Sequence, residues 1–97
     1  MPAAARQTDR NVVHCSGHNM AQGSDNVFIN GLPASRVGDS TSRHLRPGGR
    51  FCPPHTAQVS RGSTSVFING RPAARVGDPI SGCTSIAQGS PDVFIGG

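Results

Sequence analysis

The most regular apolar feature of the chain is a Val-Phe-Ile triplet that occurs three times, at residues 27–29, 66–68 and 93–95. Each triplet follows a Gly-Ser sequence by two residues. The first two triplets lead into Asn-Gly and the third into Gly-Gly. β-Branched and aromatic residues bounded by turn residues are typical of short strands, and Asn-Gly suits the positive φ angles of a type I′ turn. The pattern therefore predicts short strands that each enter a tight hairpin.

A second repeated block follows the first two hairpins. Pro-Ala-Ser-Arg-Val-Gly-Asp at residues 33–39 is matched by Pro-Ala-Ala-Arg-Val-Gly-Asp at residues 72–78, and residues 3–9 carry a diverged copy, Ala-Ala-Ala-Arg-Gln-Thr-Asp. The spacing Arg-x-x-Asp thus occurs three times, and we expect each Asp to pair with Arg or to cap a turn. The first copy lacks the Pro and the Val-Gly, so the geometry of its turn is left open.

The two blocks together describe one unit, present three times in a single domain at 1–97, with units at roughly 1–31, 32–70 and 71–97. Such units can stack as an open solenoid or close into a pseudo-threefold ring. The last copy stops at its strand and the first copy lacks one. We therefore favour a closed ring in which the two termini meet to complete a unit.

The composition limits what can stabilise this domain. The 97 residues are 34% hydrophobic and 4% aromatic. So few large apolar groups cannot offset about 1–2 kcal/mol of backbone entropy per ordered residue by burial alone. A bound metal is a common substitute for a core at this size.

Charge and targeting signals narrow the functional classes. All nine basic residues are Arg, all five acidic residues are Asp, and the formal net charge is +4. Without Lys or Glu a long helix is not expected, and the Arg residues are scattered rather than clustered as a phosphate track would be. No apolar stretch is typical of a signal peptide or a membrane span, so we expect synthesis and folding in the cytoplasm. Three Cys in that setting suit thiolate ligands better than disulfides.

The candidate metal ligands all lie in the loops between a repeat Asp and the next Gly-Ser. Three of them, His14, His44 and Cys83, each follow their repeat Asp by five residues, so a threefold arrangement brings them to the axis. His55 is the best candidate for a fourth ligand of one tetrahedral structural Zn²⁺ per chain. Cys52 could replace one His, and Cys15 with His18 could form a local chelate. Because Glu is absent and the repeat Asp suit structural pairing, the site is expected to be closed, and the protein is not expected to be an enzyme.

The aromatic residues of the triplets are the candidate partner-binding residues. Side chains alternate along a strand, so Val and Ile should share one face and Phe the other. Phe28, Phe67 and Phe94 occupy equivalent positions. They could pack together in the centre of the domain, or they could form a threefold apolar patch that docks on a threefold partner.

Taken together, the blocks at residues 33–39 and 72–78 and the three Gly-Ser-x-x-Val-Phe-Ile segments resemble the proline-alanine-alanine-arginine (PAAR) repeat family over essentially the whole chain. The resemblance implies a small cone of short β-hairpins with a zinc near its apex, held by His and Cys at positions that match His14, His44, His55 and Cys83. It also implies a partner, the trimeric β-helical valine-glycine-repeat spike protein of type VI secretion or the related phage tail spike, with one cap per trimer.

The same resemblance implies a monomeric tip protein that is assembled on the spike, delivered out of the cell, in transient contact with a target membrane, and able to carry effector proteins. No effector is expected to be fused to this chain. The alternative from a different class is a small zinc-binding nucleic-acid module, which the Arg-only basicity favours. The chain offers neither a recognition helix nor a set of stacking aromatic residues for that role, so we expect no nucleic-acid partner.

Overall fold

The structure is a computed structural model that describes residues 1–12, 18–42, 44–45, 54–81 and 84–97, with the backbone alone for 44–45 and 54–55. Its strands are β1 (Phe28–Ile29), β2 (Leu32–Pro33), β3 (His44–Leu45), β4 (Pro54–His55), β5 (Phe67–Ile68) and β6 (Arg71–Pro72). They pair as the antiparallel hairpins β1–β2, β3–β4 and β5–β6. The all-β class expected from the sequence is confirmed. No helix in the described part of the chain is long and apolar enough to cross a membrane.

The hairpins β1–β2 and β5–β6 have the turn that Asn-Gly predicts. Ile29 pairs with Leu32, and the two residues between them, Asn30 and Gly31, have φ angles of 54° and 77°. In β5–β6 the corresponding φ angles are 54° at Asn69 and 76° at Gly70. Positive φ at both central residues defines a type I′ turn, whose twist matches that of the flanking strands.

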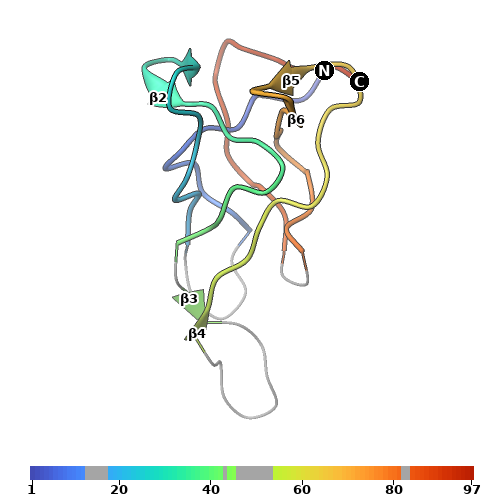
Figure 1. The fold of residues 1–97 in the computed structure, drawn as a ribbon. Coiled ribbons are helices and arrows are strands. Elements are labelled where there is room, and N and C mark those ends of the chain that lie inside the picture. The colour runs from blue at the N-terminus through green and yellow to red at the C-terminus, as the bar shows by residue number, and fades with distance from the viewer. Residues whose placement is uncertain (13–17, 43, 46–53, 82–83) are drawn as a thin grey trace.

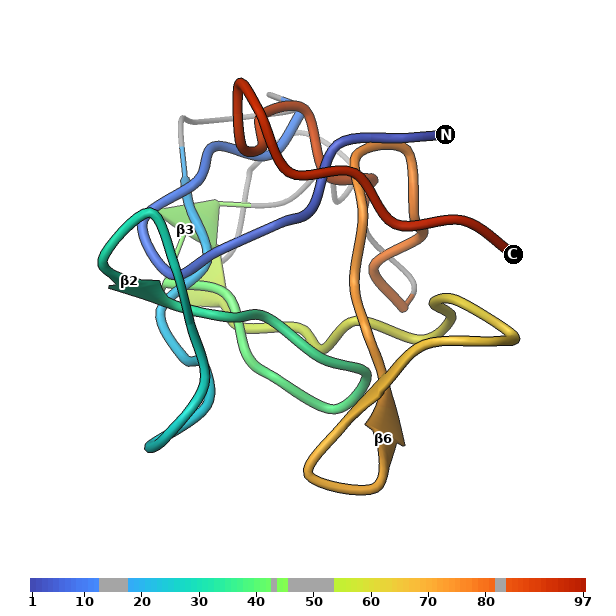
Figure 2. The ribbon, with the colours of Figure 1, turned by 90° about the horizontal axis from the view of Figure 1, so that it is seen from above.

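The third equivalent hairpin is made from the two ends of the chain. Ala3 pairs antiparallel with Phe94, as Pro33 pairs with Phe28 in the first hairpin. The Ala4 N–H donates to the Val93 carbonyl at 2.9 Å. Gly97, with φ of 79°, takes the conformation of Gly31 and Gly70. The prediction that the termini meet to complete a unit is confirmed, and the N and C labels lie close together in both ribbon views (Figures 1 and 2).

Backbone bridges between units close the ring. In the layer next to the hairpins, the Arg of each unit pairs with the motif Ala of the following unit, and the third unit pairs back to the first: Arg6 with Ala34, Arg36 with Ala73, Arg75 with Ala4. A second layer repeats this closure between the two arms of successive loops: Met20 with Thr41, Val59 with Ile80, Ile86 with Asn11. A solenoid would leave its first and last units unpaired, so the closed ring is confirmed. Figure 2 shows the three hairpin regions at three corners around the middle.

The interior is thin and consists of two small apolar clusters on the ring axis. The cluster next to the hairpins combines the motif alanines with the last residue of each triplet: Ala4, Ala34, Ala73, Ile29, Ile68 and Ile95. The cluster nearer the loops combines Ala5, Ala74, Met20, Val59, Ile80 and Ile86. The alanines are fully buried, because three backbone segments converge there and leave room only for small side chains.

Burial differs between the positions of the triplets. The Ile residues are buried and the Phe residues are exposed, as alternation predicts. Val27 and Val66 are each 37% exposed. The strands are only two residues long and begin at the Phe, so these Val residues lie at the end of the Gly-Ser turn, where less of the apolar cluster covers them.

The molecule is elongated, with extents of 40 × 23 × 22 Å. The hairpins β1–β2 and β5–β6 and both termini lie at one end, and β3 and β4 lie toward the other (Figure 1). The end that carries the three equivalent hairpins is called the hairpin end below.

The turn of the diverged first copy has the same shape as the other two, but its backbone is strained at Thr8. Thr8 has φ of 79°, where the other copies have Gly38 and Gly77 at 92° and 91°. A β-branched residue is strained in this left-handed region by about 1–2 kcal/mol, whereas Gly is not. The turn geometry that the sequence left open is thus the same in all three units.

We expect Thr8→Gly to stabilise the protein. Relief of the left-handed strain should exceed the added flexibility of Gly in the unfolded chain, which costs about 0.4–1 kcal/mol. The net gain should be about 0.5–1 kcal/mol, or a few degrees in Tm. Thermal unfolding of Thr8→Gly beside Gly77→Thr measures this, since the second variant should be less stable than the wild type. A loss of stability in Thr8→Gly would show that the Thr side chain is not strained.

Candidate functional site

The three Arg-x-x-Asp segments form one repeated ion-paired turn. In each turn the Arg Nη2 donates to Asp Oδ1 at 2.8–2.9 Å, and the Arg Nε donates to Asp Oδ2 at 2.9–3.1 Å. The main-chain N–H of the same Arg also donates to Oδ2, at 2.7–2.8 Å. The Asp therefore both pairs with the Arg and caps the turn, as the sequence predicts. The hydrogen bond to Asp, opposed by burial and assisted by the charge of the carboxylate, raises the pKa of Arg6, Arg36 and Arg75.

Each hairpin tip is hydrogen-bonded to a Gly-Ser turn of another unit. Asn30 Oδ1 accepts from Arg6 Nη1 at 3.0 Å and from Ser90 Oγ at 2.6 Å. Asn69 Oδ1 does the same with Arg36 at 2.9 Å and with Ser24 at 2.6 Å. The Arg contacts lie within one unit, whereas the Ser contacts join two units and so fix the hairpins relative to one another.

The third hairpin tip makes the same contacts with its backbone. Gly96 stands where the other tips have Asn, and its carbonyl accepts from Ser63 Oγ at 2.6 Å and from Arg75 Nη1 at 3.3 Å. A main-chain carbonyl thus replaces the Asn side chain. The signal for this network was present in the sequence as the repeated Ser and Asn, but sequence reasoning missed it because the repeat does not show which unit contacts which.

Asp92 adds two hydrogen bonds to the contact between Asn30 and Ser90. Its Oδ1 accepts from Asn30 Nδ2 at 2.8 Å and from Ser90 Oγ at 3.0 Å. These hydrogen bonds, that of Asn30 first, lower the pKa of Asp92 below the ordinary range of an Asp. A lowered pKa in the folded state means that this contact stabilises the fold above the unfolded pKa and is lost as the pH falls through the folded one. The contact is therefore intact at neutral pH.

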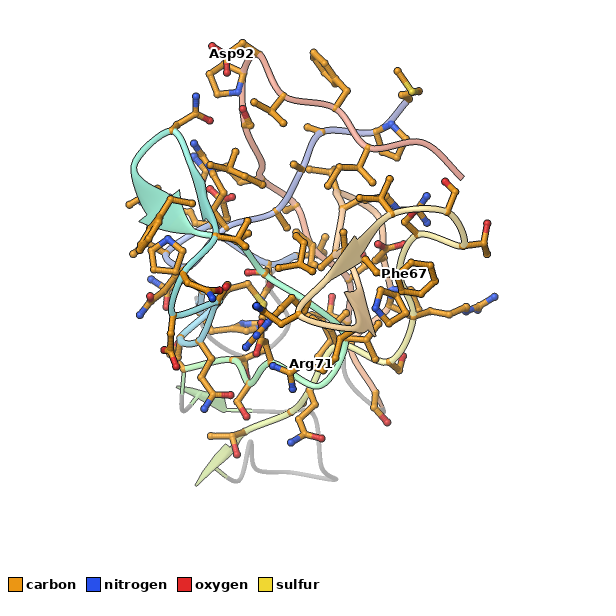
Figure 3. The ribbon with its side chains drawn as sticks, turned by 45° about the horizontal axis from the view of Figure 1, so that its top comes forward. Phe67, Arg71 and Asp92 are labelled. Carbon is orange, nitrogen blue, oxygen red and sulfur yellow. The ribbon has the colours of Figure 1, made fainter. Side chains whose placement is uncertain are left out.

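The three predicted partner-binding residues are exposed at the hairpin end. Phe28, Phe67 and Phe94 are 56%, 57% and 51% exposed, respectively. Ile29, Ile68 and Ile95, not the Phe rings, pack on the axis, so the interpretation of a central Phe cluster was wrong. The ring of Phe67 lies toward the periphery of the molecule (Figure 3). The three half-exposed rings thus occupy equivalent positions at the hairpin end.

Only some of the predicted metal ligands lie in the described part of the chain. His14, Cys83 and the alternatives Cys15 and Cys52 lie outside the described residues. Among the described residues, no three or more His, Cys, Asp or Glu come together in a group that could hold a metal ion. His44 and His55 are directly opposite each other in the β3–β4 register. His18, the other alternative, is 6% exposed, and its carbonyl accepts from the Asn11 N–H at 3.1 Å.

Comparison with protein-family models gives one match. The model described as the PAAR motif matches residues 1–43 and 51–97. The chain belongs to the PAAR-motif family. This family implies a spike-tip protein of a type VI secretion system or phage tail, known as structural rather than enzymatic, whose members generally sit on the valine-glycine-repeat spike. A comparison with curated proteins gave no match.

The geometry explains each position of the PAAR motif. Pro33 and Pro72 close the returning strands β2 and β6. The next two residues are fully buried on the axis, one in each apolar cluster or at its edge. The Arg then turns outward and donates both to the Asp three residues later and to the next hairpin tip along the chain, as Arg36 does to Asn69. The motif is therefore the segment through which each unit reaches the ring axis and leaves it.

Proposed function

We propose that this PAAR-motif protein is a non-catalytic cap that sits on the tip of a trimeric β-helical spike and sharpens it for envelope puncture. The observation that carries the proposal is the closed threefold ring, which presents the same hairpin and the same half-exposed Phe three times at one end. A single chain with this pseudo-symmetry can offer one equivalent contact to each subunit of a threefold partner. One cap would then bind one trimer.

The contacts within the hairpin end suit a docking surface. Each Asn tip is held by hydrogen bonds of 2.6–3.0 Å to an Arg of its own unit and to a Ser of another unit, and Gly96 makes the corresponding contacts. The hairpins are therefore fixed before binding, and little conformational entropy is lost when they dock. The three Phe rings would become buried on docking and would supply most of the binding free energy.

A structural Zn²⁺ at the loop end is the second part of the proposal. Opposite residues of an antiparallel pair lie about 4.5–5.5 Å apart, and the register places His44 and His55 opposite each other. Imidazole and thiolate are the ligands that zinc prefers, so the available residue types fit this metal. We assign His14, His44, His55 and Cys83 as the ligands of one Zn²⁺ per chain, with Cys52 or His18 as replacements for one of them. The metal would tie the loops together where the apolar clusters end.

The chemistry of the described residues supports a structural role. Each repeat Asp accepts hydrogen bonds from Arg side chains and from a main-chain N–H, so none is free to act as a general base.

We propose that the protein is made in the cytoplasm, is monomeric until it docks, and leaves the cell on the spike, in brief contact with the target membrane. Carriage of effector proteins is part of the same proposal.

Binding to the spike tests this function. Co-purification of the chain with a tagged trimeric spike should succeed, and the variant with Ser at positions 28, 67 and 94 should bind on the order of 100-fold more weakly, because each half-exposed Phe contributes on the order of 1 kcal/mol. Val12→Ser is the control, since Val12 is a 46% exposed apolar residue in a loop arm. Failure of the wild type to bind the spike, together with salt-sensitive retention of duplex DNA, would instead support the nucleic-acid module.

A further inference from the structure

Two arginines on the surface break the threefold repeat. Arg61 and Arg71 stand at positions whose equivalents are uncharged: Gln22 and Gln88 for Arg61, and Leu32 and Pro2 for Arg71. Asp25 and Asp92, the described Asp residues outside the ion-paired turns, lie in the other two Gly-Ser turns. The charge of the ring is thus distributed unevenly around its axis.

The ring itself does not require Arg at position 61. Gln22 Oε1 accepts from the Ser40 N–H at 2.9 Å, and Gln88 Oε1 accepts from the Arg10 N–H at 3.1 Å. Pro79 stands at the position equivalent to Ser40 and Arg10, but a proline has no main-chain N–H to donate. An acceptor at position 61 would therefore have no partner, and the chain carries an exposed Arg there instead.

Arg71 adds positive charge beside a carboxylate that is already paired. Its Nη2 donates to Asp39 Oδ1 at 3.1 Å, while Arg36 donates to both oxygens of the same Asp. The Arg71 side chain is 42% exposed and that of Asp39 is 2% exposed. Asp39 is therefore enclosed by two guanidinium groups, and the one that faces solvent is Arg71.

The two arginines lie on the same side of the ring. The Ser63 N–H donates to the Ala73 carbonyl at 2.9 Å, and a Cβ on Gly62 would lie 2.5 Å from that oxygen, so residues 61–63 run against residues 71–73. The Gly38 N–H donates to the Val59 carbonyl at 2.9 Å, which brings the Asp39 turn to the same segment. We call Arg36, Asp39, Arg61 and Arg71 the basic flank; three Arg and one Asp give these four residues a formal charge of 3 − 1 = +2. Asp25 lies near enough to Arg36 for its negative charge to help raise the pKa of that Arg, so the uncompensated positive charge of the flank is that of Arg61 and Arg71. Figure 3 shows Arg71 well apart from Asp92.

We propose that the basic flank binds an acidic segment of a second protein, different from the trimeric spike. This inference rests on the proposed function. A homotrimeric spike presents the same surface to each of the three units, so only one of its subunits could contact a feature that occurs once on the cap. A partner that binds as one copy per cap can contact the basic flank without that mismatch. Two exposed guanidinium groups suit the carboxylates of a short acidic peptide, which they can bind in bidentate fashion. A nucleic acid would need a longer basic track, and the adjacent units carry Asp instead.

A fluorescent polyglutamate peptide at low salt provides the test. The wild type should bind it, and the variant Arg61→Gln with Arg71→Leu should bind roughly fivefold to tenfold more weakly, because each solvent-exposed ion pair contributes modestly. These substitutions install the residues that the chain already carries at the equivalent positions 22 and 32. Arg10→Ser, which installs the residue found at position 40, removes one charge elsewhere and should reduce binding less than Arg61→Gln does. Equal effects of these two single variants, or absence of peptide binding by the wild type, would overturn the proposal.

Two further measurements separate this proposal from the docking role. Arg61→Gln alone should bind the spike as the wild type does, because Arg61 lies outside the hairpins β1–β2 and β5–β6. Loss of spike binding in Arg61→Gln would place the flank in the spike interface and reject the second partner, while leaving the docking role intact. Tighter binding of duplex DNA than of the peptide, weakened by Arg61→Gln with Arg71→Leu, would also reject an acidic protein segment as the ligand.

Discussion

Asp39→Ala is expected to destabilise the protein by about 2–3 kcal/mol, which corresponds to a fall in Tm of roughly 10–20 °C for a domain of this size. Asp39 is 2% exposed and accepts from the main-chain N–H of Arg36 and from the side chains of Arg36 and Arg71. Its removal leaves two guanidinium groups and one N–H without their acceptor in a turn that closes the ring. Chemical denaturation and thermal unfolding measure the loss.

Asp25→Ala is the matched control for this variant. It also removes one carboxylate, but Asp25 is exposed in a Gly-Ser turn, so its removal should change the free energy of unfolding by no more than about 0.5 kcal/mol. Asp39→Asn should fall between the two, because an amide oxygen can still accept one of the hydrogen bonds. Equal stability of Asp39→Ala and Asp25→Ala would contradict a structural role for the ion-paired turns.

Removal of zinc is expected to have the largest effect of all. We expect about one Zn²⁺ per chain to co-purify, and a strong chelator to lower the free energy of unfolding by on the order of 5 kcal/mol, since structural zinc sites in small domains contribute this much or more. The described apolar clusters are small, and β3–β4 is a pair of two-residue strands that would be marginal without a further constraint. Metal analysis and thermal unfolding with and without chelator test this.

Single substitutions test the ligand assignment. His14→Ala and Cys83→Ala should weaken zinc retention more than His18→Ala does, when zinc release to a chromogenic chelator is followed in the folded protein. His18 is buried, so its substitution can lower stability through packing alone; zinc release is therefore the deciding readout. Greater zinc loss in His18→Ala than in the other two would reject the assignment by position after the repeat Asp. An unchanged Tm in the presence of chelator would reject the structural metal itself.

Much of the fold could be predicted from the sequence because its determinants are local. The Asn-Gly turns, the alternation of Phe and Ile, and the Arg-x-x-Asp pairing each depend on residues within a few positions of one another. Closure of the ring could be predicted because the first and last copies are incomplete in complementary ways. These features recur in the structure at Asn30, Asn69 and the Ala3–Phe94 pairing.

The features that could not be predicted depend on contacts between units. Repeated Ser and Asn do not reveal that Asn30 contacts Ser90, 60 residues away, or that Gly96 replaces an Asn with its carbonyl. The strained φ of Thr8 arises because the Arg-Gln-Thr-Asp turn takes the same shape as the two Arg-Val-Gly-Asp turns of the closed ring. Exposure of the Phe rings depended on which strand face meets the axis, and two short strands alone do not decide that. The pairing of His44 with His55 required the β3–β4 register, because an inserted segment separates them.

The mass of the complex with the spike tests the central claim most directly. Native mass spectrometry of the chain mixed in excess with a trimeric spike should give a single species with one copy of this protein per spike trimer, because one pseudo-threefold ring occupies the whole threefold end. Three copies per trimer would mean that each subunit binds its own chain. That result, or no complex at all, would contradict the account of the ring as a cap.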